Sequence, residues 1–321
     1  MLKIAVYVPQ NGVIEAITPA YRLFKTANDF LVMQGKPAAF EVLYFGLTPE
    51  IKANDGEYTI KVHRTIDEVK RADLIVLPAV YGDLDVALEK NAPLYPWLRM
   101  QHQKGSTVAS LCIGAFLLGE AGLADYKECS THWAFFDIFQ SRYPLSKVVN
   151  GAIITQNDRL YTSGGANSLW NLLLYLLEKY TDRAMAIQAS KFFAIEINRD
   201  CQHHFTIFNG QKKHSDEAVL KLQNYIEQHY AAKTSIEDLA AMTNTSRRNL
   251  ERRFKNATHN TVAGYLQRVR VEAAKRSFEQ SKKNVTEVMY EVGYNDVKAF
   301  REVFKKVTGL SPLEYRNRYT T

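Results

Sequence analysis

One cysteine stands in a pattern that is typical of a reactive nucleophile. The stretch VASLCIGAFLLG, residues 108–119, has a short apolar run, a small residue, Cys112, and a glycine two positions later. This order predicts a sharp turn from a strand into a helix, which needs small neighbours such as Ser110 and Gly114. Amide groups at the start of the helix favour a thiolate. Such a thiol can attack a carbonyl or amide carbon.

Two further residues are candidates to act beside this thiol. His132 lies twenty residues further on, in STHW, as a candidate general base, and Glu15 follows the first expected strand. Because ligands of open α/β sheets gather at the carboxyl ends of parallel strands, we expect Cys112, His132 and Glu15 to converge. Trp133 and Tyr81 are candidate aromatic walls. The alternative to catalysis is an inherited turn that forms the floor of a ligand pocket, with Cys112 as a contact or a redox-sensitive thiol.

A second set of candidate residues is basic and lies in the last third of the chain. The stretch TSIEDLAAMTNTSRRNLERRFKNA predicts two short helices around a polar turn, with Ser235 and Asp238 as a capping box. Leu250 and Phe254 recur at a spacing of four, so one face of the second helix is expected to be buried. The outward residues are Arg248, Glu251, Arg252 and Lys255.

The same pattern occurs again about fifty residues later. In KNVTEVMYEVGYNDVKAFREVFKKVTG, Asn284 and Glu287 form a second capping box and Gly293 lies in the turn. Two helix-turn-helix units can place two helices in successive major grooves of double-stranded DNA, about 34 Å apart. A single copy could be an ordinary basic hairpin with solvated charges, but two matching copies favour DNA binding. The outward residues of the second copy are Lys298, Arg301, Glu302 and Lys305.

Composition and charge agree with a protein of two parts. Of the 321 residues, 46% are hydrophobic and 23% charged, and the net charge is +7. Residues 211–321 carry 21 Lys and Arg against 13 Asp and Glu, whereas residues 1–210 carry 20 against 21. A basic last third suits a polyanionic partner.

Other classes of protein are disfavoured. Three cysteines without a CxxC spacing, Cys112, Cys129 and Cys201, argue against disulfides and zinc, and the pair His203 and His204 has no spaced ligand partners. We therefore expect no metal and no cofactor. The chain shows neither a membrane-spanning run nor a signal peptide, so we expect a cytoplasmic protein.

The elements that must position these residues follow from the apolar runs. Up to about residue 180, apolar strands alternate with amphipathic helices, which predicts an α/β domain with an open parallel sheet and helices on both faces. Its first helix is expected to begin at Thr18 and Pro19. The later pattern is helical only. We therefore predict a sensing domain at 1–185, a connector at 186–214 and an all-α domain at 215–321.

Three stretches of the basic part resemble a known family. SRRNLERRFK, YLQRVRVEAAKRSF and YEVGYNDVKAFREVFKKVTGLSPLEYR are similar to the DNA-binding domain of AraC-type transcriptional regulators. His259 and Val262 stand where the family commonly has glycine and proline, so the first loop is expected to differ. The resemblance implies a seven-helix domain, with base or phosphate contacts from Arg248, Glu251 and Arg252 and from Lys298, Arg301 and Glu302.

The first part resembles a second family. VPQNGVIEAITP, SLCIG and STHW occur in the order found in the PfpI-type, class I glutamine amidotransferase-like superfamily. That resemblance makes Cys112 the nucleophile position, His132 its histidine and Glu15 the acidic residue beside the thiol. The fusion of the two parts is similar to the GlxA-type branch of AraC regulators.

The sequence therefore predicts a transcriptional regulator, with activation favoured over repression on family grounds, rather than an enzyme. A sensor needs differential binding between two states and does not need turnover. Its expected partners are double-stranded DNA, a small-molecule effector such as a nitrogen-containing metabolite, RNA polymerase if it activates, and a second copy in a homodimer. The alternative is a PfpI-type cysteine hydrolase or amidase, or a thiol redox sensor, that uses Cys112.

Overall fold

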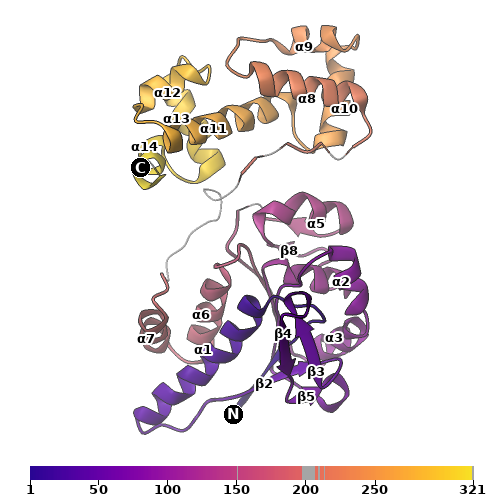
Figure 1. The fold of residues 1–321 in the computed structure, drawn as a ribbon, viewed down its shortest axis with the longest axis vertical. Helices are drawn as coiled ribbons and strands as arrows, with labels where there is room; N and C mark the ends of the chain where they lie inside the picture. Colours follow the sequence, from indigo (N-terminus) through magenta and orange to yellow (C-terminus); the bar gives the residue numbers. More distant parts are fainter. Residues whose placement is uncertain (150, 197–206, 209, 213, 320–321) are drawn as a thin grey trace. The chain divides into compact units, whose positions relative to one another are not determined.

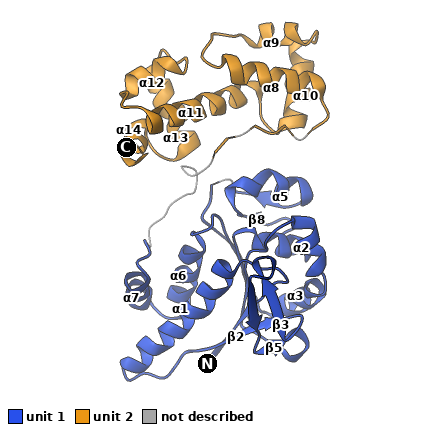
Figure 2. Ribbon diagram, in the orientation of Figure 1, with its two compact units in different colours: residues 1–202 blue, residues 203–321 orange. Residues whose placement is uncertain are grey.

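The chain divides into two compact units, Met1–Gln202 and His203–Thr321 (Figure 2). The structure, a computed structural model, describes residues 1–149, 151–196, 207–208, 210–212 and 214–319. The segment expected as a connector, 186–214, starts inside a helix, α7 (Arg183–Phe193), because Ala186 and Ala189 are buried against the first unit. Much of the remaining connector lies outside the described residues.

The first unit is built on a seven-stranded sheet (Figure 1). Its spatial order is β10 (Ile154–Asn157), β11 (Leu160–Ser163), β7 (Thr107–Leu111), β6 (Leu74–Leu77), β1 (Leu2–Tyr7), β2 (Phe40–Gly46) and β5 (Arg64–Thr65). All neighbours are parallel except β10, which is antiparallel to β11 at the edge. Two short pairs lie outside this sheet: β3 (Glu50–Ala53) with β4 (Tyr58–Lys61), and β8 (Glu128–Cys129) with β9 (Lys147–Val148). The predicted α/β fold is confirmed, with one antiparallel edge strand added.

Helices cover both faces of the sheet (Figure 1). One face carries α1 (Ile14–Met33), α6 (Leu169–Tyr180) and α7, and the other carries α2 (Leu84–Lys90), α3 (Leu94–Gln103), α4 (Ala115–Glu120) and α5 (Phe136–Arg142). Because successive strand side chains point to opposite faces, Ile4 and Val6 of β1 pack with α1, whereas Ala5 and Tyr7 join the other core. Strands buried on both faces explain the continuous apolar runs.

The first helix starts earlier than the sequence predicts. α1 begins at Ile14, so Thr18 and Pro19 lie inside it. The Ile14 backbone N–H donates to Asn54 Oδ1 at 3.0 Å, so a side chain from a distant loop, rather than Thr18, satisfies the helix start. This correction places Glu15 in the first turn of α1.

The described part of the second unit consists of seven helices, as the resemblance implied. They are α8 (Glu217–His229), α9 (Ile236–Met242), α10 (Arg247–Thr258), α11 (Val262–Gln280), α12 (Val285–Glu291), α13 (Val297–Thr308) and α14 (Pro312–Tyr319). Both predicted capping boxes are present, at the starts of α9 and α12. We call residues 235–266 the first repeat and residues 284–316 the second repeat.

The two repeats share one buried scaffold. Leu250 and Phe254 of α10 are buried, as are Phe300 and Phe304 fifty positions later in α13. A buried tyrosine follows each of the helices α10 and α13 and donates its hydroxyl to a glutamate of α8 or α11. The pairs are Tyr265 with Glu227 at 2.6 Å and Tyr315 with Glu279 at 2.5 Å. The repeated scaffold therefore holds α10 and α13 in equivalent ways.

The loops after α10 and α13 have the same backbone form, so the expected difference between them is wrong. His259 has a left-handed φ of +55°, and Gly309 has +77°. Each donates its N–H into the last turn, to Lys255 at 2.9 Å and to Lys305 at 2.8 Å. The first loop thus has the same turn as the second and places a histidine in a conformation that favours glycine.

Candidate functional site

The predicted sharp turn is present at the end of β7. Cys112 has a left-handed φ of +56° and begins the 3-10 turn that leads into α4. A Cβ at Gly114 would lie 2.3 Å from the Leu77 carbonyl oxygen, so the close approach of β6 requires glycine there. The Cys112 N–H donates to Ser163 Oγ at 3.4 Å, and its carbonyl accepts from Thr131 Oγ1 at 3.1 Å. Neighbouring segments therefore hold the strained residue in place.

The structure brings Cys112, His132 and Glu15 to one cavity of about 260 Å³. Glu15 comes from the first turn of α1, Cys112 from the end of β7, and His132 from the start of the 3-10 turn Trp133–Phe135. Cys112 is 8% exposed, whereas His132 is half-buried and Glu15 is exposed. The cavity thus opens at the carboxyl edge of the sheet, and the roles of its residues stay predictions.

The thiol in this cavity is not activated. Burial raises the pKa of Cys112 to about 11, although a backbone hydrogen bond from Ile113 lowers it in part. Burial also lowers the pKa of His132, whose Nδ1 accepts from the Ala134 N–H at 3.2 Å. Within the described part of the chain, no hydrogen bond joins Cys112 Sγ to His132. A thiol of raised pKa that makes no hydrogen bond to the imidazole, within the described residues, is not arranged to lose its proton to His132.

The aromatic wall of the cavity differs from the prediction. Its described lining includes Trp170 and Asn167, but neither Trp133 nor Tyr81. Trp133 packs on the His132 ring, with ring centroids 5.2 Å apart, and Tyr81 is 42% exposed. A sequence signal for Trp170 and Asn167 was available, because they follow the parallel strand β11 and must therefore lie at the same sheet edge.

Other candidate chemistry has little support. Among the described residues, no group of three or more His, Cys, Asp or Glu side chains could hold a metal ion. Cys129 is buried, and burial raises its pKa to about 12. Cys201, His203 and His204 lie outside the described residues. No helix in the described ranges is long and apolar enough to cross a membrane.

The predicted outward residues of α10 and α13 form the second candidate site. On α10, Arg248, Arg252 and Lys255 are exposed and Glu251 is half-buried. On α13 the outward residues Lys298, Arg301, Glu302 and Lys305 are all exposed.

Most of these cations have no protein counterion, unlike their neighbour Arg253. Arg253 donates two hydrogen bonds to the Asp216 carboxylate, at 2.8 and 2.6 Å. Arg252, the next residue along α10, donates to the neutral Asn249 Oδ1 at 3.1 Å. In the part of the chain that the structure describes, no ion pair involves Arg248, Arg252, Lys255, Lys298, Arg301 or Lys305. These positive charges are therefore available to a polyanion.

Comparison with known proteins identifies both parts of the chain. The profile of the DJ-1/PfpI family matches residues 3–179, more than half of the chain. The chain belongs to the DJ-1/PfpI family. A helix-turn-helix domain profile matches residues 239–318, which include α10 and α13. This member of the DJ-1/PfpI family therefore carries a second domain of a different fold.

Two regulators are similar to this chain over most of its length. The HTH-type transcriptional regulator CdhR of Pseudomonas aeruginosa is 25% identical over 252 residues, 78% of this chain and 74% of CdhR. The HTH-type transcriptional regulator GbdR of the same species is 25% identical over 268 residues, 83% of this chain and 72% of GbdR.

Solved structures give the same fold. An AraC family transcriptional regulator from Pseudomonas putida is 19% identical, with a TM-score of 0.52, and covers 60% of this chain and 100% of its own. A ThiJ/PfpI family protein from Pseudomonas syringae is 13% identical, with a TM-score of 0.51, and covers 84% of this chain and 88% of its own. At these identities the likeness concerns the fold alone.

The family match, the relatives and the repeated helix-turn-helix lead to one conclusion. The chain is a transcriptional regulator that joins a DJ-1/PfpI-type domain to an AraC-type helix-turn-helix domain. The predicted fold class and family are confirmed, and the arrangement fits the GlxA-type branch.

Proposed function

We propose that this regulator places α10 and α13 in successive major grooves of double-stranded DNA, and that a small molecule in the Cys112 cavity controls this binding. The observation that carries the proposal is the repeat itself. One buried scaffold occurs twice, and each copy presents exposed cations at two matching positions, Arg248 with Lys298 and Lys255 with Lys305. Two equivalent recognition helices in one chain are the arrangement that reads two adjacent grooves.

The contacts follow from side-chain chemistry. Arg248 and Arg252 can take guanine in a bidentate manner, and Glu251 can accept from cytosine. The lysines Lys255, Lys298 and Lys305 neutralise phosphates, Arg301 contacts base or phosphate, and Glu302 accepts from bases. Each bidentate base contact contributes about 1–3 kcal/mol of discrimination, so Arg248→Ala should weaken binding to the preferred sequence about tenfold or more.

The cavity favours a small, positively charged, nitrogen-containing metabolite. Glu15 is its acidic side chain, and neither lysine nor arginine is among the described residues that line it. Trp170 offers an aromatic face, which attracts a cation by about 0.5–2 kcal/mol. A volume of about 260 Å³ lies just below that of drug-sized pockets, so the effector is small.

Cys112 acts in this proposal as a ligand contact rather than a catalyst. The raised pKa of its thiol and the absence of an imidazole hydrogen bond, within the described residues, both oppose nucleophilic attack. The strained φ of Cys112 is the one observation that favours the alternatives, a cysteine hydrolase or a thiol redox sensor.

The wider setting follows from DNA binding. DNA as the target places the protein in the bacterial cytoplasm. Two copies as a homodimer would bind repeated half-sites, since the symmetry of a dimer is mirrored in its operator. If the protein activates transcription, RNA polymerase is a further partner.

The proposal is tested with the full-length chain. Duplexes selected from a random pool by the protein give its preferred sequence, and a thermal-shift screen of small amines and quaternary ammonium compounds gives the effector, since a ligand of the folded state raises the melting temperature. We expect the effector to change the affinity of the protein for the selected duplex. We also expect Glu15→Gln to weaken the binding of the effector to the protein. A protein that shows no salt-dependent DNA binding would contradict the proposal.

Cys112→Ala separates the alternatives. If the effector still changes DNA binding in this variant, neither covalent catalysis nor thiol oxidation is a necessary step. Alkylation of Cys112 in the wild-type protein should be slow at pH 7 and accelerate as the pH approaches about 11, the raised pKa of the buried thiol. Fast alkylation at pH 7 or consumption of the effector would favour the alternative hypotheses, a cysteine hydrolase or a thiol redox sensor.

A further inference from the structure

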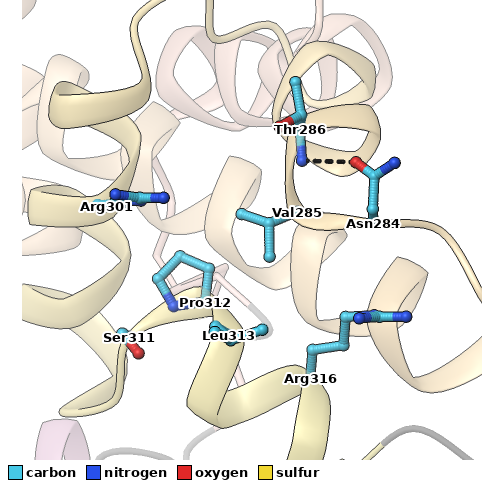
Figure 3. A pocket seen from close by; sticks show the side chains of 8 residues that line it. All are labelled: Asn284, Val285, Thr286, Arg301, Ser311, Pro312, Leu313 and Arg316. Atoms are coloured by element: carbon cyan, nitrogen blue, oxygen red, sulfur yellow. Dashed lines mark hydrogen bonds between the residues drawn. The ribbon is translucent and has the colours of Figure 1, made fainter.

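A groove beside α13 holds cations in an arrangement that base reading does not explain. The groove has a volume of about 660 Å³ and lies between α12, α13 and α14. Figure 3 shows Arg301 of α13 on one side and Arg316 of α14 on the other, with Pro312 and Leu313 between them and Val285 above. Leu313 is 54% exposed. The groove thus has an apolar middle and a guanidinium group at each side.

The protein does not neutralise these two guanidinium groups. Arg316 is half-buried, and its Nε is buried without a hydrogen-bond partner in the described part of the chain. No ion pair of the described residues involves Arg301 or Arg316. Two carboxylates beside the groove are already bonded to backbone N–H groups, Glu287 to Asn284 and Glu314 to Ser311, each at 2.7 Å. An anionic partner therefore remains to be supplied from outside.

The groove presents a cation, an apolar surface and a second cation, in this spatial order. This order matches the chemistry of a sugar–phosphate chain. Phosphates pair with guanidinium groups, and the apolar faces of the deoxyriboses between them can pack on side chains such as Val285, Pro312 and Leu313. We propose that this groove binds the backbone of one DNA strand, with Arg301 and Arg316 on two phosphates. The inference rests on the proposed DNA binding and makes Arg301 a phosphate contact rather than a base reader.

The first repeat has a matching groove with different residues at these two positions. That groove, of about 350 Å³, is lined by the recognition-helix cations together with Glu251, which stands fifty positions before Arg301. Glu251 is paired with Arg247 at 3.2 Å. Leu266 stands in the place of Arg316 and packs on the core of the first repeat. With a carboxylate at the place of Arg301 and a leucine at the place of Arg316, the first groove lacks this pair of guanidinium groups, so we assign this mode of backbone binding to the second repeat.

The experiment measures binding of the full-length protein to two fluorescent duplexes, one of mixed random sequence and one selected from the random pool, over a series of salt concentrations. Loss of one phosphate contact lowers the salt slope by about one unit. Arg301→Gln and Arg316→Gln should each do this and weaken binding to both duplexes by a similar factor, about tenfold. Arg248→Gln should instead weaken the selected duplex more than the random one.

Two controls address folding and non-specific charge effects. Arg318→Gln removes the same charge from an exposed position of α14 that does not line the groove, and should leave the slope nearly unchanged. Arg316→Lys keeps the charge and should restore most of the slope, which a merely misfolded Arg316→Gln would not predict. An unchanged slope in Arg316→Gln, or a loss of selectivity in Arg301→Gln, overturns the inference. If the wild-type protein itself fails to bind DNA, it is the proposed function that fails.

Discussion

The two repeats of the second unit have one architecture but differently built cores. In the second repeat, the ring of Phe304 contacts three other aromatic rings, those of Phe278, Phe300 and Tyr315, at centroid distances of 5.9, 5.7 and 5.5 Å. In the first repeat, the ring of Phe254 has one aromatic neighbour among the described residues, Tyr265, at 5.3 Å, and packs mainly with aliphatic residues. Aromatic pairs add about 0.5–1.5 kcal/mol each beyond their burial.

The surfaces differ as much as the cores. At corresponding positions of the two repeats, Arg248 is replaced by Lys298, Glu251 by Arg301 and Arg252 by Glu302. A duplicated scaffold fixes where the two recognition helices lie, because the buried positions repeat. It leaves the outward positions free to diverge, since they contribute little to stability. The difference teaches that each repeat can take a separate part of the DNA contact without any change of fold.

The largest expected effect tests the difference between the cores. Phe304→Ala and Phe254→Ala each remove a fully buried ring and should lower the free energy of unfolding by about 3–5 kcal/mol. Because Phe304 also loses three aromatic neighbours, its variant should be the less stable of the two. Urea unfolding of the full-length chain measures both. Equal losses would show that the additional aromatic neighbours of Phe304 contribute no stability beyond their burial.

The next prediction concerns the turns between the helices of each repeat. Gly293 has a φ of +83°, and a Cβ there would lie 2.4 Å from the Ala231 carbonyl oxygen. Gly293→Ala should therefore destabilise the protein by about 2–3 kcal/mol through strain and collision with backbone. Asn244 holds the matching place in the first repeat with a φ of +49°, so Asn244→Gly should be neutral or slightly stabilising. Thermal melts compare the two. A mild effect of Gly293→Ala would show that the second turn can relax.

Much of this arrangement could be predicted because its signals are local. The capping boxes at Ser235 and Asn284, and the buried positions of α10 and α13, depend on residues three or four apart on one helix. The convergence of Cys112, His132 and Glu15 followed from a topological rule about strand ends.

The features that sequence reasoning missed depend on distant residues. The start of α1 is set by Asn54, forty residues away, and no local pattern at Thr18 could reveal it. The cavity wall belongs to Trp170 because α6 packs beside α1, whereas Trp133 turns toward His132. Such contacts exist only once the tertiary structure has formed, and intrinsic propensity does not determine them.

A smaller effect is expected where a charge has a structural role in only one repeat. Arg253 of α10 pairs with Asp216, the N-cap of α8, while Val303 stands at the matching place in α13. Arg253→Ala should lower the urea midpoint of the full-length chain by a small amount, because the pair is bidentate but partly exposed. The adjacent Arg252→Ala, the matched control, should change stability by less than about 0.5 kcal/mol.

The Arg253 effect should depend on pH in a defined direction. The hydrogen bonds from Arg253 hold the pKa of Asp216 below its ordinary value. A lowered carboxyl pKa contributes stability above the ordinary Asp value, about 4, and that contribution is lost as the pH falls through the lower, folded value. The stability gap between wild type and Arg253→Ala should therefore be full at pH 7 and shrink below pH ~4. A gap that stays constant to low pH would show that Arg253 stabilises by packing alone.

The smallest expected effect is a gain in stability at His259, a second position where the first repeat has a side chain and the second repeat has glycine. His259 adopts a φ of +55°, the conformation that Gly309 adopts without a Cβ. His259→Gly should therefore raise the free energy of unfolding by up to about 1 kcal/mol, through relief of strain offset in part by the greater entropy of the unfolded chain. Gly309→Ala should lower it by about 1–2 kcal/mol. If His259→Gly also leaves DNA binding unchanged, the histidine is tolerated rather than used. A loss of binding would instead place the imidazole beside α10 in the DNA contact, and would make this loop a further point at which the two repeats differ in function.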